Sequence, residues 1–135
     1  MRNAVLCAGV MTPEALRAAE LDRSGKVANR IAVCHVLEAR YDLFPQREWA
    51  DLCRRIFLIH PKAIILGTFR LVSDGGNIPD VQTDERLEWW DQVLSGSITP
   101  NWIDVEWSVA QAWERVWRSW NARGIKVLAS MHDFS

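Results

Sequence analysis

The stretch Ala63–Phe69, AIILGTF, is a short run of mainly apolar and β-branched residues near the middle of the chain. Such a run, bounded by polar residues, is typical of a buried strand. It lies between two longer stretches in which apolar residues recur at helical spacing, Arg47–Phe57 before it and about Asp80 to Leu94 after it. A strand between two helices of this length indicates βαβ units and a parallel sheet.

The same alternation of strands and helices extends outward to both ends of the chain. Thr12-Pro13-Glu14 is typical of a helix start, because it combines an N-cap, a proline at the first helical position and an acid in the first turn. Right-handed crossovers place all helices on one side of the sheet if it curls into a barrel. The further strands are predicted at Asn3–Val10, Ile31–Arg40, Trp102–Trp107 and Lys126–Met131, and the further helices from Pro13 to about Ser24 and from Ser108 to Ala122.

Composition and charge exclude several classes of protein. Of the 135 residues, 49% are hydrophobic and 24% charged, which excludes a disordered or collagen-like chain and favours one domain spanning residues 1–135. The net charge of −1 lacks the basic excess of nucleic-acid-binding or membrane-binding proteins. No apolar run reaches the roughly 18 residues of a membrane span, and no signal stretch opens the chain. Three cysteines without a CxxC pair favour reduced thiols and a cytoplasmic location.

Polar residues cluster where the predicted strands end, which is where parallel α/β proteins place their sites. Within each strand these residues have the same parity, so their side chains project from one face. A single acidic residue at such a position is most often a helix cap or a solvated loop charge. Charges at four consecutive strand ends instead predict internal ion pairs, a polar ligand, or both. The residues are Glu38, Arg40 and Asp42; Thr68 and Arg70, followed by Asp74; Asp104 and Glu106; and Ser130 and His132, with Asp133 beside the histidine.

Four short strings at these strand ends resemble, in order and spacing, the type I 3-dehydroquinate dehydratases. They are LEARYDLFP (Leu37–Pro45), GTFR followed by SDGG (Gly67–Gly76), IDVE (Ile103–Glu106) and ASMHDF (Ala129–Phe134). The similarity covers essentially the whole chain. It implies a (β/α)8 TIM-barrel fold, of which this chain would hold about five strands and four helices, the amino-terminal half of the barrel.

The resemblance implies a lyase of the shikimate pathway, which leads to aromatic amino acids. The family converts 3-dehydroquinate to 3-dehydroshikimate and water through a lysine Schiff base, without metal or organic cofactor. By this resemblance His132 is the general acid/base, and its unperturbed pKa of about 6.5 suits proton transfer at neutral pH. Asp74 stands where the family usually has a glutamate aimed at the histidine, and Asp133 or Glu106 would orient the ring.

The resemblance also assigns substrate contacts. Glu38, Arg40 and Arg70 match positions that contact the substrate in the family. An arginine fork suits a carboxylate or a hydroxyl-rich ligand. The implied partner is therefore a small molecule similar to 3-dehydroquinate.

The Schiff-base lysine of the family is absent from this chain, because it lies one βα unit beyond the HDF motif. Lys26, Lys62 and Lys126 each fall before or at the start of a strand, at the opposite rim. We therefore expect the chain alone to be inactive. Two alternatives stay open: a truncated remnant that binds a carboxylate ligand or a partner chain, and another Schiff-base barrel of the aldolase type.

Five strands cannot close an eight-stranded barrel, so the first and fifth strands would have unpaired edges. We expect the chain to pair with another copy or with a complementary half. No metal site is predicted, because Cys34, His35, Cys53 and His60 lack zinc-ligand spacing.

Eight tryptophans are many for this length. Trp113, Trp117 and Trp120 recur at helical spacing, which favours a helix face packed on the sheet. Trp107 could instead line the mouth of a site.

Overall fold

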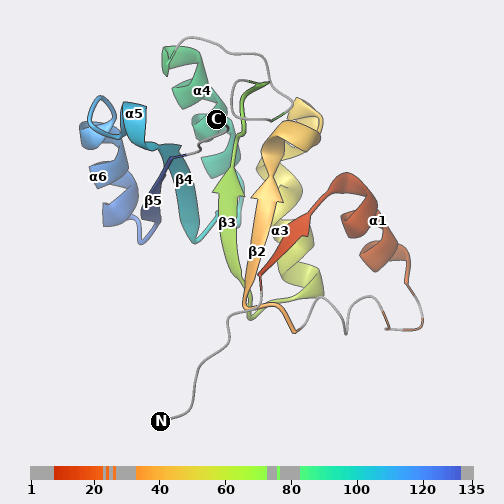
Figure 1. The fold of residues 1–135 in the computed structure, drawn as a ribbon. Helices are drawn as coiled ribbons and strands as arrows, with labels where there is room; N and C mark the ends of the chain where they lie inside the picture. Colours follow the sequence, from red (N-terminus) through yellow and green to blue (C-terminus); the bar gives the residue numbers. More distant parts are fainter. Residues whose placement is uncertain are drawn as a thin grey trace.

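The sheet consists of five parallel strands in chain order. The structure is a computed structural model that describes residues 8–22, 24, 26, 33–72, 76 and 83–131. Within these residues the strands follow the order β1-β2-β3-β4-β5, and every neighbouring pair is parallel. Figure 1 shows β1 and α1 at one end of the molecule and β5 and α6 at the other. The strands are β1 (Ala8–Met11), β2 (Val36–Arg40), β3 (Ile64–Thr68), β4 (Trp102–Glu106) and β5 (Lys126–Ser130).

Helices connect the strands, so the predicted α/β alternation is confirmed. A parallel sheet in strictly consecutive order, with its helices on one face, is an open arc of a (β/α) barrel. The helices are α1 (Pro13–Leu21), α3 (Trp49–Ile59), α4 (Thr83–Leu94), α5 (Trp107–Ala110) and α6 (Glu114–Ala122), with 3-10 turns η1 (Tyr41–Leu43) and η2 (Gln46–Glu48).

Two elements differ most from the prediction. The second strand begins at Val36, and the residues at 33–35 before it form a turn, with His35 exposed. The single helix predicted over Ser108–Ala122 is divided into α5 and α6 by a turn at residues 111–113. The indole Nε1 of Trp117 donates to the carbonyl of Ala110 at 2.8 Å, which satisfies a backbone acceptor left free at the break.

The strands have one face covered by helices and one that no described helix covers. Even-numbered residues share the open face and odd-numbered residues the helix-covered face, because paired residues in neighbouring strands have the same parity. The helix-covered face carries Met11, Leu37, Ala39, Ile65, Gly67, Ile103 and Val105, all buried; the open face carries Val10, Val36, Glu38, Arg40, Ile64, Leu66, Thr68, Trp102, Asp104, Glu106, Leu128 and Ser130.

The core on the helix-covered face is rich in aromatic rings. Trp49 and Trp90 each contact Phe69 edge to face, with ring centroids 4.7 and 4.8 Å apart. The indole Nε1 of Trp49 donates to the carbonyls of Tyr41 and Phe44 at 3.0 Å each. These contacts hold the turn after β2 against α3. The predicted packing of tryptophans on the sheet is confirmed for Trp113 and Trp120, which are buried in this core.

Gly67 permits the close approach of α4 to the sheet. A Cβ atom at this position would lie 3.1–3.2 Å from Pro100, Trp90 and Tyr41. These distances are shorter than ordinary van der Waals contact, so a larger residue would displace the aromatic core.

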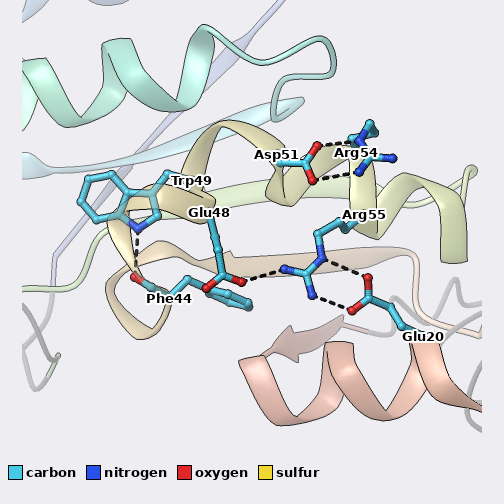
Figure 2. Close-up of polar contacts among 7 residues, drawn as sticks. All are labelled: Glu20, Phe44, Glu48, Trp49, Asp51, Arg54 and Arg55. Atoms are coloured by element: carbon cyan, nitrogen blue, oxygen red, sulfur yellow. Dashed lines mark hydrogen bonds and ion pairs between the residues drawn. The ribbon is translucent and has the colours of Figure 1, made fainter.

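The helices form a layer in the same order as the strands. Arg55 of α3 bridges two acids: its guanidinium contacts Glu20 of α1 at 2.5 Å and Glu48 of η2 at 2.9 Å (Figure 2). Further along the layer, α4 lies between α3 and α6: Gln46 in η2, just before α3, donates to Gln92 at 2.8 Å, and Trp90 stacks edge-on with Trp120. The layer therefore begins at α1 and ends at α6.

Local sequence explains where α1 begins and where α6 ends. Thr12 caps α1, as predicted, because its hydroxyl accepts from the backbone N–H of Ala15 at 3.1 Å. Gly124 follows α6 with φ of +84°, in the left-handed region that favours glycine.

Candidate functional site

The carboxyl end of the open face gathers the polar strand residues. Arg40 lies opposite Thr68 in the register of β2 and β3, and Glu106 lies opposite Ser130 in that of β4 and β5. Continuing the pairing of Leu66 with Trp102 places Thr68 beside Asp104. The amino half of the same face is largely apolar. The polar groups thus form a patch at one end of the face.

Arg40 and Asp42 form a two-point ion pair within this patch. The guanidinium donates from Nε and Nη2 to the two carboxylate oxygens at 2.8 and 2.7 Å. The Asp42 side chain is fully buried and that of Arg40 is 13% exposed. The hydrogen bonds to Asp42 raise the pKa of Arg40, against the opposing effect of burial. Two of the three guanidinium nitrogens of Arg40 are therefore already engaged.

Glu106 is also paired, with a residue from the helix layer. Arg86 of α4 donates from Nη2 to Glu106, and both side chains are largely buried. The same guanidinium lies over the ring of Trp113, 5.2 Å from its centroid. These contacts hold the Glu106 carboxylate at the end of β4.

Among the residues that the structure describes, four other polar side chains at this end of the sheet have buried atoms without a hydrogen-bond partner. They are Thr68 Oγ1, Arg70 Nε, Asp104 Oδ1 and Ser130 Oγ. A buried polar atom left unpaired costs about 1–3 kcal/mol, so native proteins seldom leave several together. One further such atom, the indole nitrogen of Trp113, belongs to the helix-side core. The concentration of partnerless donors and acceptors on one face makes this end of the sheet the candidate site for a polar ligand.

The structure brings together part of the predicted site. Glu38, Arg40 and Glu106 lie on the open face, and Arg70 follows by alternation from Phe69, which is buried in the helix-side core. Asp74, His132 and Asp133 lie outside the residues that the structure describes.

The strand-end pattern of the sequence includes further members of this patch, to which it assigns no role. Thr68, Asp104 and Ser130 have the right parity at strand ends, but the family resemblance assigns them no role, and Asp42 stands out only as a strand-end charge. Arg86 carries no signal in the sequence, because it lies on a helix far along the chain from Glu106.

Two of the three lysines lie at the other end of the strands. Lys62 is in the turn before β3, Lys126 is the first residue of β5, and Lys26 precedes β2; all are exposed. Lys62 and Lys126 therefore lie at the amino rim of the sheet. A strand of five residues spans about 16 Å, which separates this rim from the polar patch.

Two pockets lie away from the open face. One of about 590 Å³ lies between α1, α3 and the turn after β2, where Arg55 pairs with its two acids. The other, of about 260 Å³, is lined by Trp107 and residues of α5 and α6. Trp107 therefore lines a pocket on the helix layer. Among the described residues no three His, Cys, Asp or Glu side chains are placed to hold a metal ion. No helix in the described ranges combines the length and the apolar character needed to span a membrane.

Comparison with known proteins gives a consistent match. The family model for type I 3-dehydroquinase matches residues 15–135. Solved 3-dehydroquinate dehydratases from Enterococcus faecalis and Geobacillus kaustophilus superpose with TM-scores of 0.75 and 0.71, at 17% and 23% identity. They cover 96% and 94% of this chain, and 54% and 49% of their own length is matched.

A type I 3-dehydroquinate dehydratase from Clostridium difficile, solved with covalently modified comenic acid, gives a TM-score of 0.72 at 20% identity. In that case 95% of this chain and 51% of the other are covered. The chain thus spans about half the length of the solved structures it matches. No curated protein matches it by sequence.

Proposed function

Because the chain belongs to the type I 3-dehydroquinase family, we propose that its open face binds 3-dehydroquinate as one half of a dehydratase site. The observation that carries this proposal is the group of partnerless buried atoms on Thr68, Arg70, Asp104 and Ser130. A small molecule with a carboxylate and several hydroxyl groups offers the acceptors and donors that these atoms lack.

Arg70 and Arg40 have different roles in the proposed substrate binding. Arg70 has a buried Nε without a partner, whereas Arg40 already donates two hydrogen bonds to Asp42. We therefore assign the substrate carboxylate chiefly to Arg70, with Arg40 providing positive charge beside it. Glu38, lower on the same face, would accept from a substrate hydroxyl.

Proton transfer in this proposal belongs to His132, on the strength of the family resemblance. Dehydration removes a proton from the carbon next to the ketone, and the hydroxyl group leaves as water once it is protonated. A histidine near its pKa performs both transfers at neutral pH. Asp74 and Asp133 are the proposed supporting carboxylates. Glu106 is the third, and its pairing with Arg86 fixes its position.

The proposal includes no imine on this chain's own lysines. An imine requires an amine within bonding distance of the substrate ketone, whereas Lys62 and Lys126 lie at the amino ends of β3 and β5. These positions also favour the second candidate function, binding of a carboxylate ligand without turnover.

We further propose a role in the shikimate pathway and a reducing, cytoplasmic compartment. Cys53 is a buried free thiol. Burial raises the pKa of the Cys53 thiol to about 11, so this thiol stays protonated and unreactive near neutral pH.

Ligand binding is tested by titrating the chain with 3-dehydroquinate while its tryptophan fluorescence is recorded. We expect saturable quenching, and Arg70→Ala should weaken the affinity at least tenfold, since a charge-assisted pair is worth about 1.5–3 kcal/mol. Arg54→Ala is the matched control, because that arginine is exposed on α3 and pairs only locally with Asp51 (Figure 2). Equal affinities for the two variants would contradict the assignment.

Whether a lysine of this chain forms an imine is tested by borohydride reduction in the presence of 3-dehydroquinate, followed by measurement of the intact mass. We expect no adduct on this chain. A covalent adduct would show that one of its lysines reaches the substrate.

A further inference from the structure

The pocket of about 590 Å³ lies in a groove between α1 and α3, away from the open face of the sheet. Its two long walls are neighbouring helices of the helix layer, and the turn after β2 forms a third wall. Small-molecule sites in proteins have volumes of about 300–1,000 Å³ and combine apolar walls with a few polar groups. The pocket is therefore large enough for a small ligand.

An ion-pair bridge joins the two helices across one part of the groove. Arg55 of α3 lies between Glu20 of α1 and Glu48, as Figure 2 shows. Its Nε and Nη2 donate to the two oxygens of Glu20 at 3.0 and 2.5 Å, and its Nη1 donates to Glu48 Oε1 at 2.9 Å. All three nitrogens of this guanidinium are thus engaged, and the bridge sets the distance between the helices at this level.

The charges nearer the start of α1 are not used in this bridge. Glu14, Arg17 and Glu20 are spaced three residues apart along α1, so they share one side of the helix, and all three line the pocket. Glu20 pairs with α3, whereas in the described part of the chain neither Glu14 nor Arg17 forms an ion pair, and both are exposed. A carboxylate and a guanidinium one helical turn apart are therefore available to a ligand.

The turn after β2 gives the pocket an apolar wall. Leu43, Phe44 and Pro45 line it from this turn. The indole Nε1 of Trp49 donates to the carbonyl of Phe44 at 3.0 Å, which fixes the turn against α3. Figure 2 shows the Phe44 ring beside the carboxylate of Glu48. An apolar surface thus lies next to the charged groups of the pocket.

We propose that this pocket binds a small zwitterion with an apolar body, which is the chemistry of a free α-amino acid with an apolar side chain. Arg17 pairs with the carboxylate of the ligand, Glu14 pairs with its ammonium group, and its side chain contacts Phe44 and Pro45. The described lining holds three carboxylates and two guanidinium groups, a net charge of −1. An anion without an ammonium group would meet this negative excess, and an amine without a carboxylate would leave Arg17 unpaired.

The test is isothermal titration calorimetry of the 135-residue chain with L-leucine. We expect saturable binding. N-acetyl-L-leucine lacks the ammonium group and L-leucinamide lacks the carboxylate, so each should bind about fivefold more weakly, the effect of one charge pair at a partly exposed site. Absence of L-leucine binding would overturn the proposal. Equal affinities for the three compounds would overturn it as well, because the pocket would then not recognise a zwitterion.

Two variants place the binding in this pocket. Arg17→Ala and Glu14→Gln should each weaken the affinity for L-leucine about fivefold. Arg118→Ala is the matched control, because that arginine is exposed on α6 and pairs locally with Glu114, and it should bind L-leucine like the unchanged chain. Circular dichroism verifies that all three variants fold. Unchanged affinity in both Arg17→Ala and Glu14→Gln would overturn the proposal, since L-leucine would then occupy another surface. The titration contains no 3-dehydroquinate, so its result is independent of the proposed function.

Discussion

The two faces of the sheet differ in the kind of side chains that they bury. The helix-covered face buries apolar and aromatic side chains whose few polar atoms are largely paired, such as the Tyr41 hydroxyl with Cys53 Sγ at 3.1 Å. The open face carries charged groups and buried atoms without partners. The first face accounts for stability. The second retains unpaired polar groups that reduce stability, which is typical of a surface kept for binding.

One chain segment contributes both to the apolar core and to the polar face of the sheet. Successive residues of a strand project from opposite faces, so each strand contributes to the core and to the site at once. Ile64 and Ile65 are adjacent, yet the first is half-buried on the open face and the second is buried under the helices. A substitution can therefore probe one face while leaving the other nearly unchanged.

The largest expected effect is the loss of a core side chain. Ile65→Ala should lower the free energy of unfolding by about 3 kcal/mol, because it leaves a cavity under α3 and α4. Ile64→Ala removes the same atoms from the open face and should cost about 1 kcal/mol. Urea unfolding of both variants measures the difference. Equal losses would mean that the two faces are equally packed.

Breaking the ion pair of the open face should have the next largest effect. Arg40→Ala leaves the fully buried Asp42 carboxylate without its guanidinium and should cost about 2 kcal/mol. Arg40→Lys retains the charge but not the two-point geometry, and we expect an intermediate loss. The same unfolding measurement applies. A loss below about 0.5 kcal/mol for Arg40→Ala, as at an exposed ion pair, would contradict the burial of this pair.

Removal of a partnerless hydroxyl should increase the stability of the fold rather than reduce it. Thr68→Val replaces the buried Oγ1 with a methyl group of similar size and should stabilise the chain by about 1 kcal/mol. The same variant should bind 3-dehydroquinate less tightly under the proposed function. Thermal unfolding and fluorescence titration measure the two effects. Destabilisation by Thr68→Val would show that the hydroxyl has a partner in the folded chain.

The smallest expected effect is the loss of stability at acidic pH that comes from the ion pair between Glu20 and Arg55 in the helix layer. The hydrogen bond from Arg55 lowers the pKa of Glu20 below its ordinary value of 4.5. Since the folded-state pKa is the lower one, the stabilisation is present above about pH 4.5 and is lost as the pH falls through the folded value. Both side chains are partly exposed, so the contribution is about 0.5 kcal/mol.

Glu20→Gln should therefore remove part of the decline in stability between about pH 5 and pH 3. Glu14→Gln, at an exposed acid of the same helix, is the matched control for the loss of one carboxylate. A Glu20→Gln profile parallel to that of the unchanged chain would show that the pair with Arg55 does not stabilise the fold.

Most of the fold could be predicted from the sequence, since the strands β3, β4 and β5 differ from their predicted ranges by one residue at most at each end. The second strand is shorter than its prediction because the predicted range begins with the apolar residues Ile31–Cys34, and apolar character alone does not show where pairing begins. The division between α5 and α6 escapes prediction for a related reason. Helical spacing continues through the turn, and the indole of Trp117 that caps the break lies seven residues beyond the acceptor on Ala110.

The sequence by itself determined which residues share a face, because parity along a strand is a local property of the backbone. Parity alone therefore places Glu38, Arg40, Asp104 and Glu106 on one side of the sheet. Only the tertiary structure decided how their charges are used. Two nitrogens of Arg40 donate to Asp42, and Arg86 donates to Glu106 from the helix layer. The buried hydroxyl of Thr68 has no hydrogen-bond partner among the described residues. Such pairing depends on how distant segments pack in space, which periodicity does not encode.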